Sequence, residues 1–145
     1  MKTAFMILLF TFSCCAINAQ ESVNEDNASA YKGKFYNKEY NIYLVINLSE
    51  KNILVPGQEV LGELDGYFGS NQTSHIWAIT SSTINEKNAT IEVVNNYGSE
   101  DFIASITIKD NETLEFKHLN GSTFKFPVNN KWQKIPSKIL LKNGK

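Results

Sequence analysis

A period of two in the apolar residues runs through almost the whole chain from Tyr31 onward, and it constrains the fold more than any other feature of the sequence. For example, Tyr40, Ile42, Leu44, Ile46 and Leu48 alternate with Asn41, Tyr43, Val45 and Asn47. Such alternation indicates β-strands that bury one face. It predicts strands at residues 31–36, 39–48, 52–56, 64–69, 74–82, 89–95, 101–109, 112–118, 122–127, 131–135 and 138–142.

Helical signals are weak. No stretch of ten residues has the spacing of an amphipathic helix, and only Gly57 to Gly62 fits a helical turn. Within that turn, Val60 and Leu61 are spaced to reach Leu64.

The predicted strands are joined by short polar turns, of which Asn120-Gly121 is the strongest hairpin signal. Consecutive strands with short connections favour an antiparallel meander. A meander of this length removes its exposed edges best by closing on itself. We therefore expect an all-β domain over residues 31–145, a single antiparallel up-and-down β-barrel or a closely related sandwich.

The segment Tyr31 to Asn37, followed by the strand at 42–48, resembles the opening of lipocalin- and avidin-type (calycin-like) β-barrels. Those barrels begin with a Gly-x-aromatic strand and continue as a meander around a ligand cavity, so the resemblance implies such a cavity. Trp77 and Trp132 stand in contexts that do not match avidin, and no biotin-binding residue is carried over. The C-terminal helix of lipocalins has no counterpart in the sequence either.

The N-terminus has the form of an export signal. Lys2 precedes an apolar run at residues 4–12, and small residues then lead to Ala19. The run is much shorter than the roughly 20 residues of a membrane-spanning helix. We expect a signal peptide at 1–19, a flexible polar leader at 20–30 and a secreted or periplasmic protein.

A lipoprotein signal is the alternative, because Ser13-Cys14 half fits its pattern. Attachment to a membrane is expected only if the chain is lipidated at Cys14 or Cys15. With cleavage after Ala19 the mature chain contains no cysteine, which excludes disulfides and thiolate metal sites.

The amino-acid composition limits the kinds of partner that we expect. The formal net charge of −1 gives no reason to expect a nucleic-acid partner, and the absence of arginine removes any guanidinium clamp for phosphate or carboxylate. The 17 asparagines create six Asn-x-Ser/Thr sequons, read here as turn formers of an AT-rich bacterial gene rather than glycosylation sites. The five lysines of the last fifteen residues either protect an edge strand or form a basic docking face.

Titratable residues give no strong catalytic signal. His75 and His118 are the only histidines, so we expect no metal and no cofactor. His118 lies on an apolar stripe and is expected to hold a backbone carbonyl. Glu63 and Asp65 would share one face of an extended strand, in range for a glycosidase pair. The neighbouring glycines favour a bend at a barrel corner instead, and we expect no enzyme.

Aromatic residues carry the best functional hint. Several fall largely on inward stripes: Phe35, Trp77, Phe102, Phe116, Phe124, Phe126 and Trp132. They either fill the interior, which we favour, or leave a cavity for a small apolar or aromatic ligand. The residues expected to bind such a ligand, inside the barrel or at its mouth, are Phe35, Tyr67, Phe68, Trp77, Phe116 and His118.

The expected function is thus an exported, non-enzymatic binding module for a small apolar or aromatic ligand. The alternative is a protein-recognition module, such as an inhibitor or immunity protein directed against a toxin or hydrolase. A deep apolar cavity would favour the first function. A filled barrel with an exposed aromatic or acidic ridge would favour the second.

Overall fold

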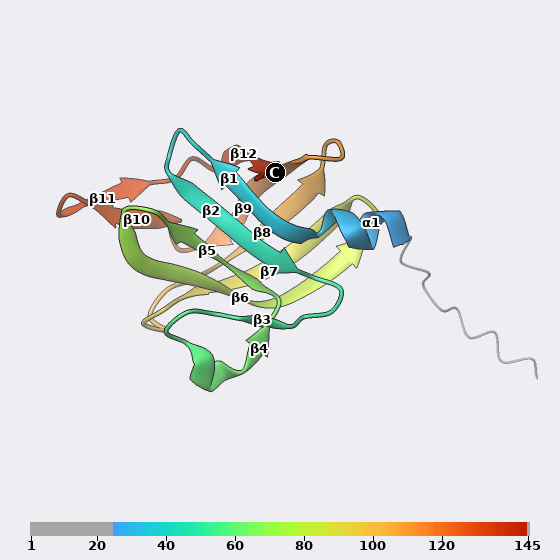
Figure 1. The fold of residues 1–145 in the computed structure, drawn as a ribbon. Coiled ribbons are helices and arrows are strands. Elements are labelled where there is room, and N and C mark those ends of the chain that lie inside the picture. The colour runs from blue at the N-terminus through green and yellow to red at the C-terminus, as the bar shows by residue number, and fades with distance from the viewer. Residues whose placement is uncertain (1–24, 145) are drawn as a thin grey trace, which may run out of the picture.

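The computed structural model describes residues 25–144, so the expected signal peptide and the cysteines lie outside the described residues. Eight strands form one closed antiparallel barrel in the order β1-β12-β9-β8-β7-β6-β5-β2, as the alternation predicts (Figure 1). These strands are β1 (Lys32–Asn37), β2 (Ile42–Asn47), β5 (Gly66–Ser70), β6 (Thr73–Asn85), β7 (Asn88–Asn95), β8 (Asp101–Ile108), β9 (Thr113–Gly121) and β12 (Lys138–Asn143).

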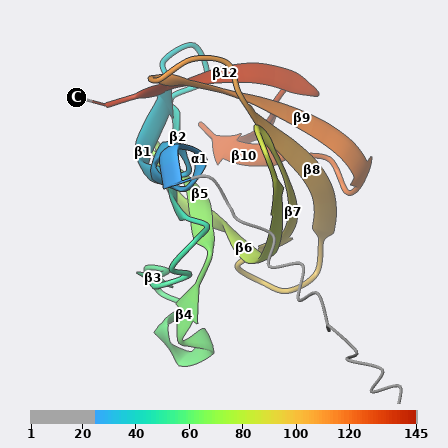
Figure 2. The same cartoon turned by 90° about the vertical axis from the view of Figure 1, so that its right-hand side faces the viewer.

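Two insertions interrupt this up-and-down meander, each built on a separate two-stranded sheet. The first, called the arm here, contains β3 (Ile53–Leu54), the 3-10 turn η1 (Glu59–Leu61) and β4 (Glu63–Leu64). The second, called the cap hairpin, contains β10 (Lys125–Val128) and β11 (Lys131–Lys134). In Figure 2, β10 is seen across the lumen of the barrel, while the arm hangs outside the wall.

The two ends of the barrel are closed by different parts of the chain. The cap hairpin follows β9 and covers one end, where Trp77 Nε1 donates a hydrogen bond to Lys125 O at 2.9 Å. At the opposite end, a short helix α1 (Glu25–Ala30) leads into Tyr31. Tyr31 is fully buried, and its hydroxyl donates to Ile106 O at 3.2 Å. The helix lies in the segment expected to be a flexible leader.

Inside the wall, burial follows the predicted alternation. Ile42, Leu44 and Ile46 of β2 are at most 1% exposed, whereas Tyr43 and Val45 are only partly buried. The inward residues of all eight strands meet in one core cluster, to which the cap hairpin and its flanking residues add Phe124, Phe126 and Ile135. The hydrophobic core is therefore the barrel interior itself.

The hairpin turn predicted at Asn120-Gly121 is wrong. Both residues belong to β9, where they pair with Ile103 and Phe102 beside an irregularity in the register. Gly121 is needed there for close approach, because a Cβ atom would lie 2.6 Å from Asp101 O. Its φ of 99° is also one that side chains rarely adopt. A sequence signal for a turn thus marks the end of a long strand, just after a bulge.

The predicted strand at 64–69 is divided in two. β4 ends at Leu64 and β5 begins at Gly66, so the chain leaves the arm and enters the barrel wall around Asp65. A Cβ atom on Gly66 would collide with Val45 O of the neighbouring strand. The glycine therefore permits a close approach at the corner, as the sequence led us to expect.

The basic C-terminal strand is not an edge. β12 pairs with β9 on one side and with β1 on the other, which closes the barrel. Within the lysine-rich segment 131–145, β11, with Lys131 and Lys134, is an edge strand, because it pairs with β10 alone. The lysines of β12 therefore do not protect a free strand edge.

Candidate functional site

Aromatic rings occupy the interior of the barrel. Four residues expected to contact a ligand are at most 2% exposed: Phe35, Phe68, Trp77 and Phe116. Phe124, which precedes the cap hairpin, has its ring centroid 5.0 Å from that of Phe68 and 5.2 Å from that of Phe116. These are contact distances for aromatic pairs. The inward rings therefore pack against one another, with the cap segment inserted among them.

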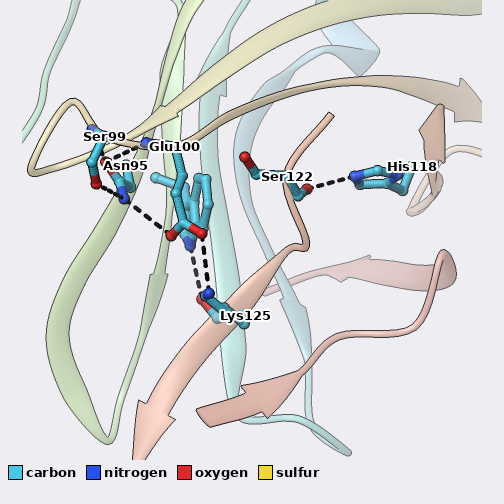
Figure 3. A network of polar contacts seen from close by, with 7 residues as sticks. Asn95, Ser99, Glu100, His118, Ser122 and Lys125 are labelled. Carbon is cyan, nitrogen blue, oxygen red and sulfur yellow. Dashed lines mark hydrogen bonds and ion pairs between the residues drawn. The ribbon is translucent and has the colours of Figure 1, made fainter. Parts of the chain in front are cut away.

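The other two residues expected to bind a ligand do not join this group. Tyr67 lies on the outer face of β5, where its ring meets Tyr43 edge to face at 6.1 Å and burial raises the pKa of its phenol. His118 Nε2 lies 2.8 Å from Ser122 O (Figure 3), the backbone contact expected for this residue. Its ring also packs on Phe102 at 5.2 Å. The Tyr67 contact stabilises the outer face of the wall, and the His118 contacts stabilise the end of β9.

The arm is fixed to the outer face of the barrel by a second, smaller core. Val55 is fully buried against Ile76 and Ala78, which point outward from β6. Leu64 of the arm and Val94 of β7 are partly buried against the same cluster. The packing extends across strands β5 to β7, so the arm lies on the wall as a docked element rather than a free loop.

Polar contacts hold the arm at its base and near its tip. Asp65, only 4% exposed, accepts a hydrogen bond from Ser82 Oγ and lies 3.5 Å from Lys51 Nζ. Gln58 Nε2 donates to Asn96 O at 3.3 Å. Because these partners belong to β6 and to the turn after β7, the arm is braced at two separate places on the barrel.

Three large apolar side chains project from this braced arm. Val60 is 93% exposed, Leu54 57% and Leu61 50%. Two exposed carboxylates accompany them, Glu59 and Glu63. Glu59 Oε1 accepts a hydrogen bond from Gly57 N at 3.1 Å, and backbone hydrogen bonds lower the pKa of its carboxyl group. The tip thus combines an apolar surface with negative charge.

The sequence predicted the position of the turn at the arm tip, but not the direction in which its side chains point. The helical turn expected between Gly57 and Gly62 is present as η1, yet Val60 and Leu61 face solvent instead of packing with Leu64. Gly62, with φ of 73°, redirects the chain after the turn. A Val-Leu pair between two glycines was the signal that could have drawn attention to this surface.

The carboxylate pair proposed from the sequence does not form. Glu63 lies on the exposed arm, whereas Asp65 is buried at the base and bonded to Ser82. The two side chains occupy different environments, so the extended-strand geometry that would align them is absent.

A second cluster lies at the cap end, around His75. The His75 ring is 4% exposed and contacts Trp77, Phe126, Tyr97 and Trp132, with ring centroids 5.6–5.8 Å away. Tyr97 is 75% exposed and Trp132 54% exposed, although Trp132 was placed among the inward aromatics by its sequence pattern. We call the surface formed by Tyr97, Trp132, Glu100, Lys125 and Lys134 the aromatic rim. Apart from the turn at residues 95–98, no sequence pattern indicated this cluster.

A polar network holds the rim in position (Figure 3). Asn95 Oδ1 accepts from the backbone N–H of Ser99 at 3.0 Å, and Asn95 Nδ2 donates to Ser99 Oγ at 3.1 Å. Glu100 Oε1 pairs with Lys125 Nζ at 3.0 Å. Lys125 Nζ also lies 4.9 Å above the Trp132 ring. The turn after β7 is thereby tied to the cap hairpin.

Comparisons with protein-family models, curated proteins and solved structures return no match for this chain. Across residues 25–144, no group of three or more His, Cys, Asp or Glu side chains is placed to hold a metal ion. No helix in the same part of the chain is long and apolar enough to cross a membrane. The exposed side chains of the arm tip and of the aromatic rim make these two surfaces the candidate sites.

Proposed function

We propose that this chain is a non-enzymatic protein-recognition module whose arm inserts into a partner protein. The observation that carries the proposal is the exposure of Leu54, Val60 and Leu61 within eight residues of a docked element. Single exposed apolar residues are ordinary, whereas a contiguous group marks an interaction surface. An exported inhibitor or immunity protein would present such a segment to a toxin or hydrolase.

Rigidity of the arm supports this function. Val55 and Asp65 anchor it through a buried apolar contact and a buried carboxylate, and Gln58 holds it close to the tip. A segment already held in its bound conformation loses little conformational entropy on association. The arm can therefore contribute its apolar contacts to affinity without a folding cost.

The chemistry of the tip indicates the partner's complementary surface. An apolar pocket would receive Val60 and Leu61. Cationic side chains at its border would face Glu59 and Glu63, since charge complementarity steers association and fixes register. The partner is accordingly a protein with an apolar cleft bordered by lysine or arginine.

A small ligand inside the barrel has less support. The closed meander is compatible with the calycin-like resemblance, but Phe124 packs among Phe68, Phe116 and Trp77 where that resemblance implies a cavity. One hollow of about 680 Å³ lies on the outside, at the seam of β1 and β12. Its lining includes Tyr36 and Leu140, and neither of them is among the residues expected to bind a ligand.

The proposal is tested by crosslinking and then by affinity. A photoreactive amino acid at position 60 should capture a partner from the exported fraction of the native cell, whereas one at position 119 should not. Leu119 is a matched control because it is 50% exposed, like Leu61, on β9. With the purified partner, the Val60→Ser/Leu61→Ser variant should bind at least about tenfold more weakly, and Leu119→Ser should bind normally. Equal capture at both positions, or unchanged affinity of the arm variant, would exclude the arm as the recognition surface.

A further inference from the structure

The aromatic rim has features that stability alone does not explain. Among the described residues, two buried side-chain atoms have no hydrogen-bond partner, His75 Nε2 and Gln133 Oε1. His75 contacts the Phe126 ring, and Gln133 is the residue paired with Phe126 across the cap hairpin. An unpartnered buried polar group destabilises the folded state, because it has lost its hydrogen bonds to water. Local costs of this kind concentrate at functional sites.

The exposed rings of the rim are of one chemical kind. Tyr97 and Trp132 both carry a polar group on an aromatic body, and they flank His75 from different elements of the fold. The exposed aliphatic residues Val60 and Leu61 belong to the arm instead. An aromatic face carries negative charge density and attracts weakly positive C–H groups, such as those on one face of a sugar ring. Amphipathic tyrosine and tryptophan rings, as opposed to exposed leucine or valine, favour a saccharide over the acyl chains of a lipid.

Charge on the same surface selects the kind of saccharide. Across the cap hairpin, Lys125 pairs with Lys134 and Pro127 with Trp132, which places all four on one face of the two-stranded sheet. Lys125 is neutralised by Glu100, but no carboxylate of the described chain lies within 4.0 Å of Lys134 Nζ. Lys134 is thus left without an acidic partner in the described chain, and an anionic group of a ligand would pair with it.

We infer that the aromatic rim binds an acidic saccharide, with a sugar ring stacked on Trp132 or Tyr97 and a carboxylate paired with Lys134. This site uses none of the exposed residues of the arm tip, although Gln58 of the arm is hydrogen-bonded to Asn96 beside Tyr97, and it does not depend on the protein-recognition function. Burial also lowers the pKa of His75, so the imidazole beneath the rings is neutral and does not compete for the carboxylate.

The experiment is a calorimetric titration of the folded protein with hexagalacturonate, and with maltohexaose as a neutral sugar. Binding of hexagalacturonate should weaken at least about tenfold in Trp132→Ala, a loss typical of a residue that dominates a binding site. Lys134→Gln should weaken it about threefold or more, as expected for one charged contact. Lys131→Gln is the matched control, because Lys131 lies on the same strand but on its other face.

Each result decides the inference. Binding of the acidic sugar that falls in Trp132→Ala and Lys134→Gln but not in Lys131→Gln supports it. Failure of hexagalacturonate to bind, equal affinity for maltohexaose, or equal loss in both lysine variants overturns it. Anionic vesicles containing phosphatidylglycerol provide the last comparison, since binding to them without binding to the sugar assigns the rim to a lipid surface. The Val60→Ser/Leu61→Ser variant should keep full sugar affinity, which separates this test from that of the arm.

Discussion

The two insertions in this barrel are built alike but treat their apolar residues in opposite ways. The cap hairpin buries Phe126 completely and, just before it, Phe124 to 1% exposure. The arm buries Val55 but leaves Leu54 and Val60 largely in solvent. Both are short two-stranded sheets inserted between neighbouring strands of the wall. Apart from Trp132 on its outer face, the cap hairpin thus directs its aromatic residues into the core, whereas the arm directs Leu54, Val60 and Leu61 into solvent.

The largest expected difference between the two concerns stability. Phe126→Ala should lower the free energy of unfolding by about 3–5 kcal/mol, because it removes a buried ring from the core. Leu54→Ala, on the exposed part of the arm, should change it by less than about 0.5 kcal/mol. Urea denaturation of both variants measures the difference. Similar losses in the two variants would mean that the arm tip belongs to the cooperative core.

An intermediate effect is expected where the arm joins the wall. Asp65→Ala leaves the partly buried Ser82 hydroxyl without its acceptor and should cost about 1–3 kcal/mol. Glu63→Ala is the matched control, since this carboxylate is exposed and its removal should cost no more than about 0.5 kcal/mol. Thermal unfolding of the pair distinguishes them. Equal melting temperatures would show that Asp65 contributes nothing to docking.

A smaller effect should depend on pH and belong to the cap end alone. Burial lowers the pKa of His75, Glu100 opposes this shift and Lys125 adds to it. As the pH falls below about 6.5, the usual histidine value, the unfolded chain takes up a proton that folded His75 does not accept. The free energy of unfolding should therefore fall between pH 7 and pH 5, and it should fall less in His75→Phe. Identical pH profiles for the two proteins would contradict a buried neutral imidazole.

The barrel wall could be predicted from sequence because a period of two determines which face of each strand is buried. The alternation in residues 40–48 corresponds to β2, and the one in 101–109 corresponds to β8. The same signal could not separate wall from insertion. Phe124 and Phe126 alternate with Lys125 like any wall strand, but these residues lie in and beside a hairpin packed across the barrel end. Whether a strand joins the wall depends on hydrogen bonds to distant neighbours, which the alternation does not encode.

The candidate sites were harder to predict than the fold, for a related reason. Exposure of Val60 follows from how the arm docks, and that docking depends on contacts between Val55 and Ile76, about twenty residues apart. The rim likewise joins Tyr97 and Trp132 through His75 on a third element. Such groupings arise only when the closed barrel brings the elements together, so the expected ligand residues were mostly core residues.

The smallest expected effect concerns whether the arm moves independently of the barrel. Gln58→Ala removes the side-chain hydrogen bond to Asn96 O near the tip but leaves Val55 buried at the base. Because segments with few buried contacts open locally at low free energy, the variant should exchange the amide hydrogens of Leu61 and Gly62 faster. Both amides donate within the arm, to Gln58 O and Glu59 O.

Amide exchange at Ile91, which is fully buried in the wall, provides the control for that experiment. It should change much less than exchange at Leu61, since one partly buried hydrogen bond contributes little to global stability. Faster exchange at Ile91 together with Leu61 would mean that the arm opens only when the whole barrel unfolds. Faster exchange confined to the arm would identify Gln58 as the contact that holds the tip rigid, and affinity for a partner should then fall in Gln58→Ala although none of the exposed apolar residues has changed.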